Sequence, residues 1–289
     1  MSRFRSIFVA TDFSPASRPA FRTAVRMAAA SGARLSIGYA LPLVPKGVAV
    51  PMYQEMEANL RSEAEKRMNA AVRVARAAGA RPRALLLRGV PHEAVRRAAR
   101  EYRADLVVVG THGRTGLARV FMGSVAARVL ATSPCPVLSV RSRPGAPAPR
   151  TILYATDFSE ASRQAWKQAL GLARTYRARL RIVHVETELA QAQSARWAYA
   201  EAATEVRADA RRRLQALHKA ARKAGVRSDR LLLRGLAHEA IVRAARSLPK
   251  AWIVVGTHGR TGLSGALIGS VAARVVATAS CPVMTVRSR

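Results

Sequence analysis

The stretch Val108-Val109-Gly110-Thr111-His112-Gly113-Arg114-Thr115-Gly116-Leu117 decides the fold, because it occurs a second time, unchanged, at residues 254–263. A repeat period of about 146 residues indicates two complete domains rather than a solenoid of small repeats. We expect domains at residues 1–143 and 150–289, joined by a short linker at 144–149 that is rich in proline. Four shorter segments recur at an offset of 146 or, near the start, 145: 123–129 as 269–275, 85–89 as 231–235, 135–137 as 281–283 and 10–14 as 155–159.

Each copy alternates short β-branched segments with helical patterns. The segment Leu106–Val109 is apolar at every position, as expected for a parallel strand that is covered on both faces. Five strands that alternate with four helices predict a parallel α/β domain. Right-handed crossovers then bring the carboxyl ends of all strands to one edge, where such sheets bind ligands. The predicted strands of the first copy are 6–11, 34–41, 83–88, 106–110 and 137–141, and its predicted helices are 16–31, 53–78, 91–102 and 124–132.

A glycine motif lies at this edge. Gly110 ends the fourth predicted strand, and Gly123 and Ser124 open the helix that follows. Glycines let a backbone approach a ligand closely, and the free N–H groups of a helix N-terminus attract anions. The motif therefore indicates a cradle for phosphates. The alternative is that the glycines only form turns and that Ser124 is an N-cap. Two identical copies of the ten-residue loop favour phosphate binding.

An aspartate ends the first predicted strand of each copy, Asp12 and Asp157. Beside a phosphate site, the natural partners of a carboxylate are ribose hydroxyls or base N–H groups. The alternative is an N-cap for the next helix, for which Ser14 and Ser159 compete. We favour the binding role, and one residue could do both.

The remaining histidines and cysteines suggest little chemistry. His112 and His258 lie inside the glycine loops, where a solvated role competes with a phosphate contact. No second His or Cys lies at ligand spacing, so we expect no metal site. The pairs 92–93 and 238–239, each His-Glu, open a predicted helix and are interpreted as structural. Cys135 and Cys281 each precede a proline and an apolar strand, where a small buried residue fits better than a reactive one.

Several catalytic signatures are absent from the sequence. There is no P-loop, no Gly-x-Gly-x-x-Gly after the first strand, no nucleophile elbow and no catalytic carboxylate pair. We therefore expect no catalytic residues and no fast hydrolysis.

The chain carries 49 Lys and Arg against 17 Asp and Glu, a net charge of +32. The residues up to Pro149 hold 24 basic and 8 acidic side chains and the rest hold 25 and 9, so each half carries +16. This even division and 49% hydrophobic residues exclude a disordered basic tail. No apolar run approaches the roughly 20 residues of a membrane span, and the start lacks the apolar core of a signal peptide, so we expect a cytoplasmic protein.

Together, the spaced glycines and the strand-ending aspartate resemble the ATP-binding branch of the universal stress protein family. The resemblance covers both copies, about 140 residues each. It implies two doubly wound α/β domains of the adenine nucleotide alpha hydrolase-like fold, each with a five-stranded parallel sheet of order 3-2-1-4-5. ATP, with or without Mg²⁺, would bind between strands 1 and 4.

The resemblance also implies which residues surround the nucleotide. Where the family has a larger aliphatic residue against adenine, the first copy has Ala40, whereas Val185 keeps that bulk in the second. In the first copy the residues are Ala10, Asp12, Ala40, Val109, Gly110, His112, Gly113, Gly123, Ser124 and Val125. In the second copy they are Ala155, Asp157, Val185, Val255, Gly256, His258, Gly259, Gly269, Ser270 and Val271.

The function implied is that of a nucleotide-dependent stress-response regulator or adaptor with at most slow ATP hydrolysis, acting on a protein partner that the sequence does not name. The last strands, 137–141 and 283–287, would pair within one chain as an intramolecular pseudo-dimer, and a homodimer could form in addition. The alternative is a nucleic-acid or polyanion binder in which nucleotide binding is weak or lost, suggested by the charge. Aromatic residues make up only 5% of the chain, which disfavours stacking on bases.

Overall fold

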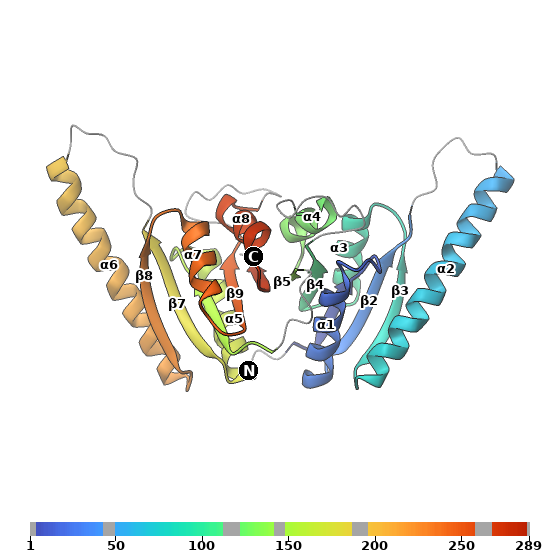
Figure 1. Cartoon of the computed structure of the whole chain (residues 1–289), viewed down its shortest axis with the longest axis horizontal. Coiled ribbons are helices and arrows are strands. Elements are labelled where there is room, and N and C mark those ends of the chain that lie inside the picture. Colours follow the sequence, from blue (N-terminus) through green and yellow to red (C-terminus); the bar gives the residue numbers. More distant parts are fainter. Residues whose placement is uncertain are drawn as a thin grey trace. The chain divides into compact units, whose positions relative to one another are not determined.

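The computed structural model (Figure 1) describes residues 4–42, 50–111, 122–141, 148–186, 196–257 and 268–287 of the 289. Contacts divide the chain into two compact units. We call Phe4–Ala146 the N-terminal unit and Pro147–Arg289 the C-terminal unit. Residues 144–147 of the predicted linker lie outside the described residues.

The N-terminal unit contains one parallel sheet of order β3-β2-β1-β4-β5, which confirms the predicted fold and strand order. Its elements are β1 (Ser6–Ala10), α1 (Arg18–Ser31), β2 (Arg34–Ala40), α2 (Val50–Ala77), β3 (Arg81–Leu87), α3 (Pro91–Glu101), β4 (Leu106–Gly110), α4 (Ser124–Thr132) and β5 (Val137–Val140).

The C-terminal unit repeats this topology with the order β8-β7-β6-β9-β10, again with parallel neighbours. Its elements are β6 (Thr151–Ala155), α5 (Glu160–Tyr176), β7 (Arg179–Glu186), α6 (Arg196–Lys223), β8 (Ser228–Arg234), α7 (Ala237–Arg246), β9 (Ala251–Gly256), α8 (Ser270–Thr278) and β10 (Val283–Val286).

Small differences from the predicted boundaries have local causes. The first helix begins at Arg18 rather than residue 16, because Ser17 is its N-cap and Pro19 stands in its first turn. The third strand begins two residues early, at Arg81, and includes Pro82. A proline is tolerated there because β3 is the edge strand of its sheet and Pro82 is close to the start of the strand.

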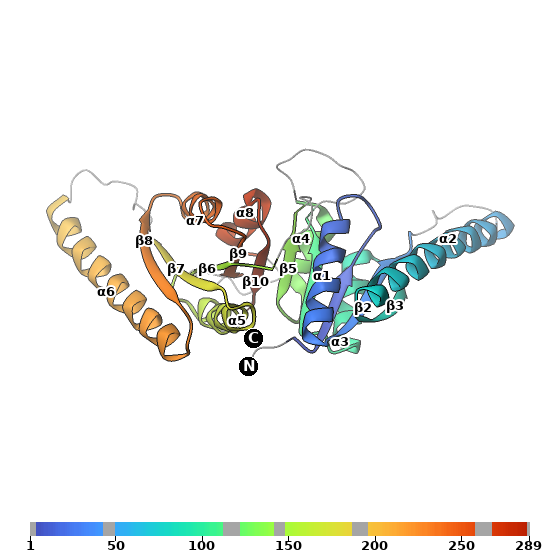
Figure 2. The same cartoon turned by 60° about the horizontal axis from the view of Figure 1, so that its bottom comes forward.

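The core of each unit lies between the sheet and the helices on both of its faces. In the N-terminal unit, Val107 and Val108 of β4 are fully buried, as the apolar pattern predicts. Ala20, Ala24 and Ala28 form a buried stripe along α1, which packs on β1 and β4, and these small side chains let the helix come close to the sheet. Figures 1 and 2 show the long helices α2 and α6 running along β3 and β8.

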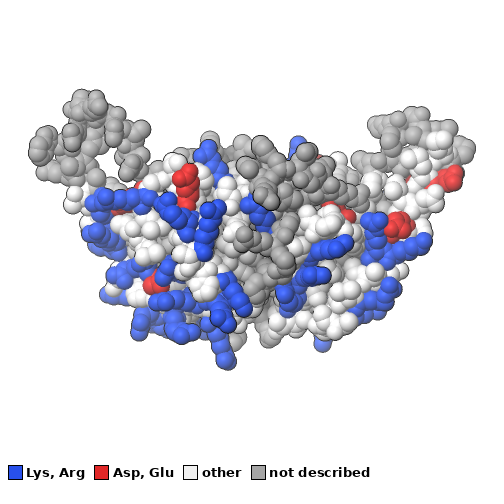
Figure 3. Space-filling model, viewed as in Figure 1, with Lys and Arg blue, Asp and Glu red and all other residues white. Residues whose placement is uncertain are grey.

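The surface matches the basic composition. On the face drawn in Figure 3, Lys and Arg side chains are spread over both units and acidic side chains are sparse. None of the described helices is long and apolar enough to cross a membrane.

Candidate functional site

The carboxyl edge of the N-terminal sheet brings together the predicted site residues that the structure describes there. β1 pairs with β4 with Val9 opposite Val108, so the same register sets Thr11 beside Gly110. β1 also pairs with β2 with Ala10 opposite Gly38, and Thr11 N donates to the Gly38 carbonyl at 2.9 Å. Asp12 follows two residues after the end of β1, at the same edge as Ala40, the last residue of β2. The predicted site residues at these strand ends are Ala10, Asp12, Ala40, Val109 and Gly110.

The C-terminal unit repeats this arrangement. β6 pairs with β9 with Tyr154 opposite Val254, and with β7 with Ala155 opposite Val183. Thr156 N donates to the Val183 carbonyl at 2.9 Å. The strand ends there collect Ala155, Asp157, Val185, Val255 and Gly256.

Asp12 lies in a tight turn that local hydrogen bonds hold. Its Oδ1 accepts from Ser14 N at 3.0 Å and from Ser14 Oγ at 2.6 Å, and Phe13 between them has a left-handed φ of 59°. Burial raises the pKa of Asp12, but hydrogen bonds from Ser14 and Ser17 outweigh it, so the pKa lies below its ordinary value. The carboxylate is thus ionised at neutral pH. Ser17 precedes α1 without a side-chain cap, and the capping-type hydrogen bond at this helix start comes from Ser14, whose Oγ accepts from Ser17 N at 3.2 Å.

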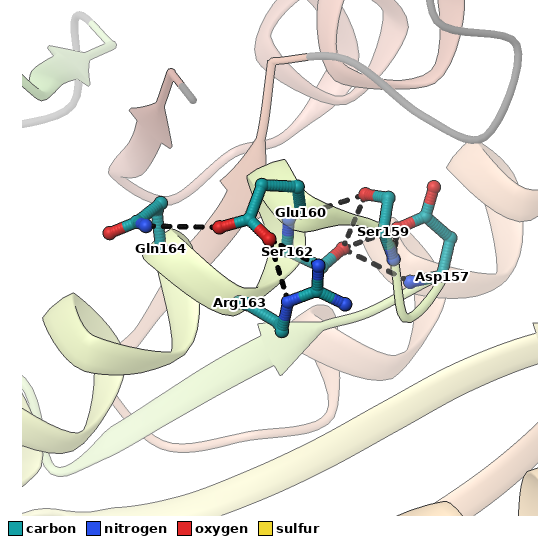
Figure 4. Close-up of polar contacts among 6 residues, drawn as sticks. All are labelled: Asp157, Ser159, Glu160, Ser162, Arg163 and Gln164. Carbon is teal, nitrogen blue, oxygen red and sulfur yellow. Dashed lines mark hydrogen bonds and ion pairs between the residues drawn. The ribbon is translucent and has the colours of Figure 1, made fainter. Parts of the chain in front are cut away.

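Asp157 lies in the same kind of turn but has a different partner (Figure 4). Its Oδ1 accepts from Ser159 N at 3.0 Å and, in a short hydrogen bond, from Ser162 Oγ in the first turn of α5. Ser159 is the N-cap of α5, and its side chain accepts from Ser162 N, so the competing cap predicted here is confirmed. Burial raises the pKa of Asp157, but the bonds from Ser159 and Ser162 lower it below its ordinary value overall.

A helix N-terminus completes each edge. Gly123 and Gly269, which have no side chain with which to cap, are the N-caps of α4 and α8. Ser124 is therefore the first helical residue, and the alternative that it is an N-cap is wrong. Gly123 N donates to the Thr111 carbonyl at 2.9 Å and Gly269 N donates to the Thr257 carbonyl at 2.7 Å, which ties each helix start to the end of strand 4.

The first-turn N–H groups of α4 and α8 have no acceptor within the helix, which gives each helix start a partial positive charge. Val125 and Val271 in these first turns are 39% exposed. The predicted residues at the two helix starts are Gly123, Ser124, Val125, Gly269, Ser270 and Val271. His112, Gly113, His258 and Gly259 lie outside the described residues.

An aromatic pair lies beside each aspartate turn, and the sequence patterns did not predict it. The Phe158 ring lies 4.6 Å from the His184 ring, and the Phe13 ring lies 5.1 Å from the Tyr39 ring. His184 is buried, and its Nδ1 is 2.7 Å from the Thr156 carbonyl oxygen. The repeated Asp-Phe-Ser was the available signal, because a left-handed phenylalanine after the aspartate turns its ring toward the sheet.

The Phe158 and His184 rings border a cavity of about 840 Å³ in the C-terminal unit, between the Asp157 turn and α6. The Arg213 guanidinium lies 5.5 Å from the centre of the Phe158 ring. The cavity is lined by Asp157, Phe158, Ser159, Glu160, His184, Glu205, Val206, Asp209, Ala210, Arg212 and Arg213. Since α6 contributes six of these eleven residues, its position affects the shape of the edge beside Asp157.

Glu186 ties α6 to the end of β7. Arg207 Nε donates to both Glu186 carboxylate oxygens at 3.1 and 3.2 Å, and Arg234 of β8 lies 3.4 Å from the same group. Glu186 is the residue after Val185, so this ion-pair network borders the predicted site. In the N-terminal unit the corresponding residue is the uncharged Leu41.

The two cysteines, predicted to be buried, are half-buried free thiols. Burial raises the pKa of Cys135 and of Cys281 to about 11, so both are protonated at neutral pH and are poor nucleophiles.

The fold and the edge together define a class of protein. Each unit is a doubly wound α/β domain of the adenine nucleotide alpha hydrolase-like fold, with a carboxylate and a helix N-terminus beside the point where the strand order reverses.

The chain belongs to the universal stress protein family, whose family model matches it twice, at residues 3–141 and 149–287. A universal stress protein of Thermus aquaticus is 38% identical over 138 residues, which cover 48% of this chain and 99% of the relative. A second, from Methanocaldococcus jannaschii, is 31% identical over 141 residues, which cover 48% of this chain and 82% of the relative. The crystal structure of a universal stress protein from Archaeoglobus fulgidus, 18% identical, superimposes with a TM-score of 0.74 over 98% of both chains, which supports the fold.

Proposed function

We propose that each unit binds ATP at the carboxyl edge of its sheet and that the protein is a stress-response regulator whose bound nucleotide changes its shape or its partners. One observation carries this proposal. In both units an ionised aspartate and a helix start whose N-cap is a glycine lie at the ends of strands 1 and 4. The aspartate suits the hydrogen-bond donors at one end of a nucleotide, and the helix start suits the anionic phosphates at the other end.

The helix starts fit a phosphate chain. Free N–H groups and a partial positive charge at α4 and α8 favour an anion, and Ser124 and Ser270 add a hydroxyl beside them. In this proposal Gly123, Ser124 and Val125 hold the phosphates in the N-terminal unit, together with His112 and Gly113. Gly269, Ser270 and Val271 take this role in the C-terminal unit, together with His258 and Gly259.

The aspartates fit the other end of the nucleotide. Asp12 and Asp157 are ionised and lie beside β2 and β7, so they can accept from ribose hydroxyls or base N–H groups. Adenine would lie against Ala40 in one unit and Val185 in the other. The smaller Ala40 buries less apolar surface, which costs about 1–2 kcal/mol of binding free energy.

We further propose that hydrolysis, if any, is slow. A general base needs a pKa near neutrality and a free lone pair that faces water. The Oδ1 atoms of Asp12 and Asp157 already accept hydrogen bonds within their own turns, and both pKa values are lowered rather than raised. Both carboxylates are therefore suited to orienting a ligand and are weak proton acceptors.

Calorimetry of the full chain with ATP tests the proposal. We expect up to two sites, loss of one site in Asp12→Ala or Asp157→Ala, and no binding in the double variant. Asp105→Asn is the matched control, because this aspartate also accepts backbone hydrogen bonds but lies at the start of β4, at the opposite edge. Mass spectrometry of small molecules released from the purified protein identifies the nucleotide. No heat with ATP, and no released adenine nucleotide, would refute the proposal.

The intramolecular pairing of β5 with β10 also stays a proposal. Each is the last strand of its own five-stranded order, so each needs a cover for its outer edge. We expect a monomer in light scattering. A dimer that dissociates when a proline is placed in β5 would argue against the pairing.

A further inference from the structure

The amino edge of the N-terminal sheet, opposite the proposed ATP edge, gathers arginines. Arg34 and Arg81 begin β2 and β3 and are direct partners in the parallel register. Arg83 is the partner of Ser36 and points to the same face as Arg81, because it is two residues further along the strand. Adjacent strands are about 4.8 Å apart, so these three exposed side chains start as close neighbours. We call Arg34, Arg81 and Arg83 the arginine corner.

No carboxylate neutralises this corner within the part of the chain that the structure describes. None of its three arginines forms an ion pair there. Nearby Asp105 uses both carboxylate oxygens to accept from Arg5 N at 2.7 Å and Ser6 N at 3.1 Å. Glu101 instead hydrogen-bonds Tyr102 and raises the pKa of that phenol. Like charges on neighbouring strands repel, so the corner favours an added anion.

The C-terminal unit shows what such an anion does at the same place. Its counterparts of Arg34, Ser36 and Arg83 are Arg179, Arg181 and Asp229. Asp229 accepts two hydrogen bonds from Arg181, both at 2.8 Å, and lies 3.0 Å from Arg179 Nε. One unit therefore holds its own oxyanion between two guanidinium groups. The N-terminal unit has Arg83 at the position of this acid and Ser36 at the position of Arg181.

We propose that the arginine corner binds a backbone phosphate of a nucleic acid, in the position that the Asp229 carboxylate takes in the C-terminal unit. The guanidinium fork matches phosphate as well as carboxylate, and 43 of the 49 basic residues are arginines. Arg76, in the last turn of α2 just before β3, and Arg103, just before β4, are further exposed arginines beside the corner. A chain of regularly spaced phosphates can engage several such groups at once.

The ring of Tyr102 supports one arm of the corner. Arg83 Cζ lies 5.3 Å from the centre of this ring, so the guanidinium is held against the end of α3. This contact restricts the conformations of the Arg83 side chain, so less conformational entropy is lost when a phosphate binds it. This binding is independent of ATP binding at the carboxyl edge.

The test is fluorescence anisotropy of a short labelled DNA duplex with the full chain at several salt concentrations. Arg83→Asp copies the acid of the C-terminal unit, and Ser36→Arg/Arg83→Asp copies its whole ion pair, so both changes suit the fold. We expect the affinity of both variants for the duplex to be about tenfold weaker at low salt. The slope of log affinity against log salt concentration should be smaller by about two, because the substitution removes the charge of Arg83 and its new carboxylate pairs with Arg34. The Asp229→Ala variant, in which Arg179 and Arg181 lose their carboxylate partner, should bind the duplex more tightly than the wild type.

Arg22→Asp is the matched control, because it makes the same charge change on the exposed face of α1. Equal binding by the wild type and Arg83→Asp would overturn the proposal, and so would an equal loss in Arg22→Asp, which would indicate net charge alone. Full competition by inorganic phosphate at matched ionic strength would assign the corner to free phosphate instead. Competition by polyglutamate as strong as by unlabelled duplex would assign it to acidic protein. ATP calorimetry should be unchanged in Arg83→Asp.

Discussion

Ser162 donates from its hydroxyl to Oδ1 of Asp157, five residues earlier in the chain, and so ties the carboxylate of the C-terminal site to the first turn of α5. The corresponding serine of the N-terminal unit, Ser17, pairs with the Thr11 hydroxyl and donates to the Ser14 carbonyl, each at 3.1 Å, and the hydroxyl from which Asp12 Oδ1 accepts at 2.6 Å is that of Ser14. Two sites with the same sequence signal therefore hold their aspartates by different contacts. The difference makes the aspartate turns separately testable.

Replacing Ser162 by Ala should destabilise the protein by about 1–2 kcal/mol at pH 7, because a charged acceptor loses a donor. The folded pKa of Asp157 is lowered, so this stabilisation is present above the unfolded pKa and is lost as the pH falls through the folded value. The gap between wild type and variant should thus narrow below about pH 4, while the part that comes from the bond of Asp157 N to Ser162 Oγ remains. Urea unfolding across pH measures it, with Ser31→Ala, which removes a serine hydroxyl from the end of α1, as the control. A gap that is independent of pH would contradict this account.

Exchanging Ala40 and Val185 should exchange the affinities of the two proposed ATP sites. Ala40→Val adds apolar surface against adenine and should tighten the N-terminal site about five- to thirty-fold, and Val185→Ala should weaken the C-terminal site by a similar factor. Calorimetry in an Asp157→Ala or Asp12→Ala background isolates each site. If neither exchange changes the affinity, adenine does not lie against these residues.

Gly256→Ala should destabilise the C-terminal unit by about 1–3 kcal/mol. An added Cβ would lie 2.9 Å from the carbonyl carbon of Ala161 and 3.0 Å from Ser162 N, and this backbone cannot move without shifting α5. Thermal unfolding measures the loss. Ala161→Gly removes only a Cβ contact and should rescue little, so a full rescue would show that the backbone contact is unimportant.

Glu186→Gln should loosen α6. Glu186 and Arg207 are 18% and 34% exposed, so their ion pair is screened less than a surface pair, and its loss should speed hydrogen exchange in α6 severalfold. Glu160→Gln removes an exposed pair with Arg163 on α5 and should leave exchange unchanged. Equal protection of α6 in both variants would show that Glu186 does not hold the helix.

Cys135 and Cys281 should react slowly with thiol reagents in the folded protein at pH 8. With each pKa raised to about 11, only about one thiol in a thousand is ionised at that pH. Labelling rates with and without urea measure this, and denaturation should accelerate both sites. Fast labelling of the folded protein would mean that the pKa values of these thiols are not raised.

Local patterns predicted most of the fold. The uniformly apolar β4 and the alternation of elements sufficed for a parallel α/β unit, because burial on both faces dictates such a composition. The strand order came from a family resemblance, since periodicity does not say which strands are neighbours. The start of β3 was missed because a proline within a strand is tolerated only where the strand is an edge, which depends on the whole sheet.

The candidate site was predictable only in part. Asp12 and Asp157 were found because strand ends share one edge, but their partners were not, because the choice between Ser14 and Ser162 depends on the shape of each turn. The contact between Glu186 and Arg207 spans 21 residues and requires the docking of α6, which no local pattern encodes. The cavity beside Phe158 was missed for the same reason.

The hydrogen bond from Gly123 N to the Thr111 carbonyl has a consequence for how such a domain can diversify. It joins the two ends of the intervening segment to each other, so the sheet and α4 meet whatever lies between them. Closure entropy grows slowly with the length of a connection, by only about 0.6 kcal/mol for each doubling. Insertions and replacements at this place should therefore be tolerated far better than changes in the strands, which would let descendants of one duplicated gene acquire new ligands on an unchanged frame.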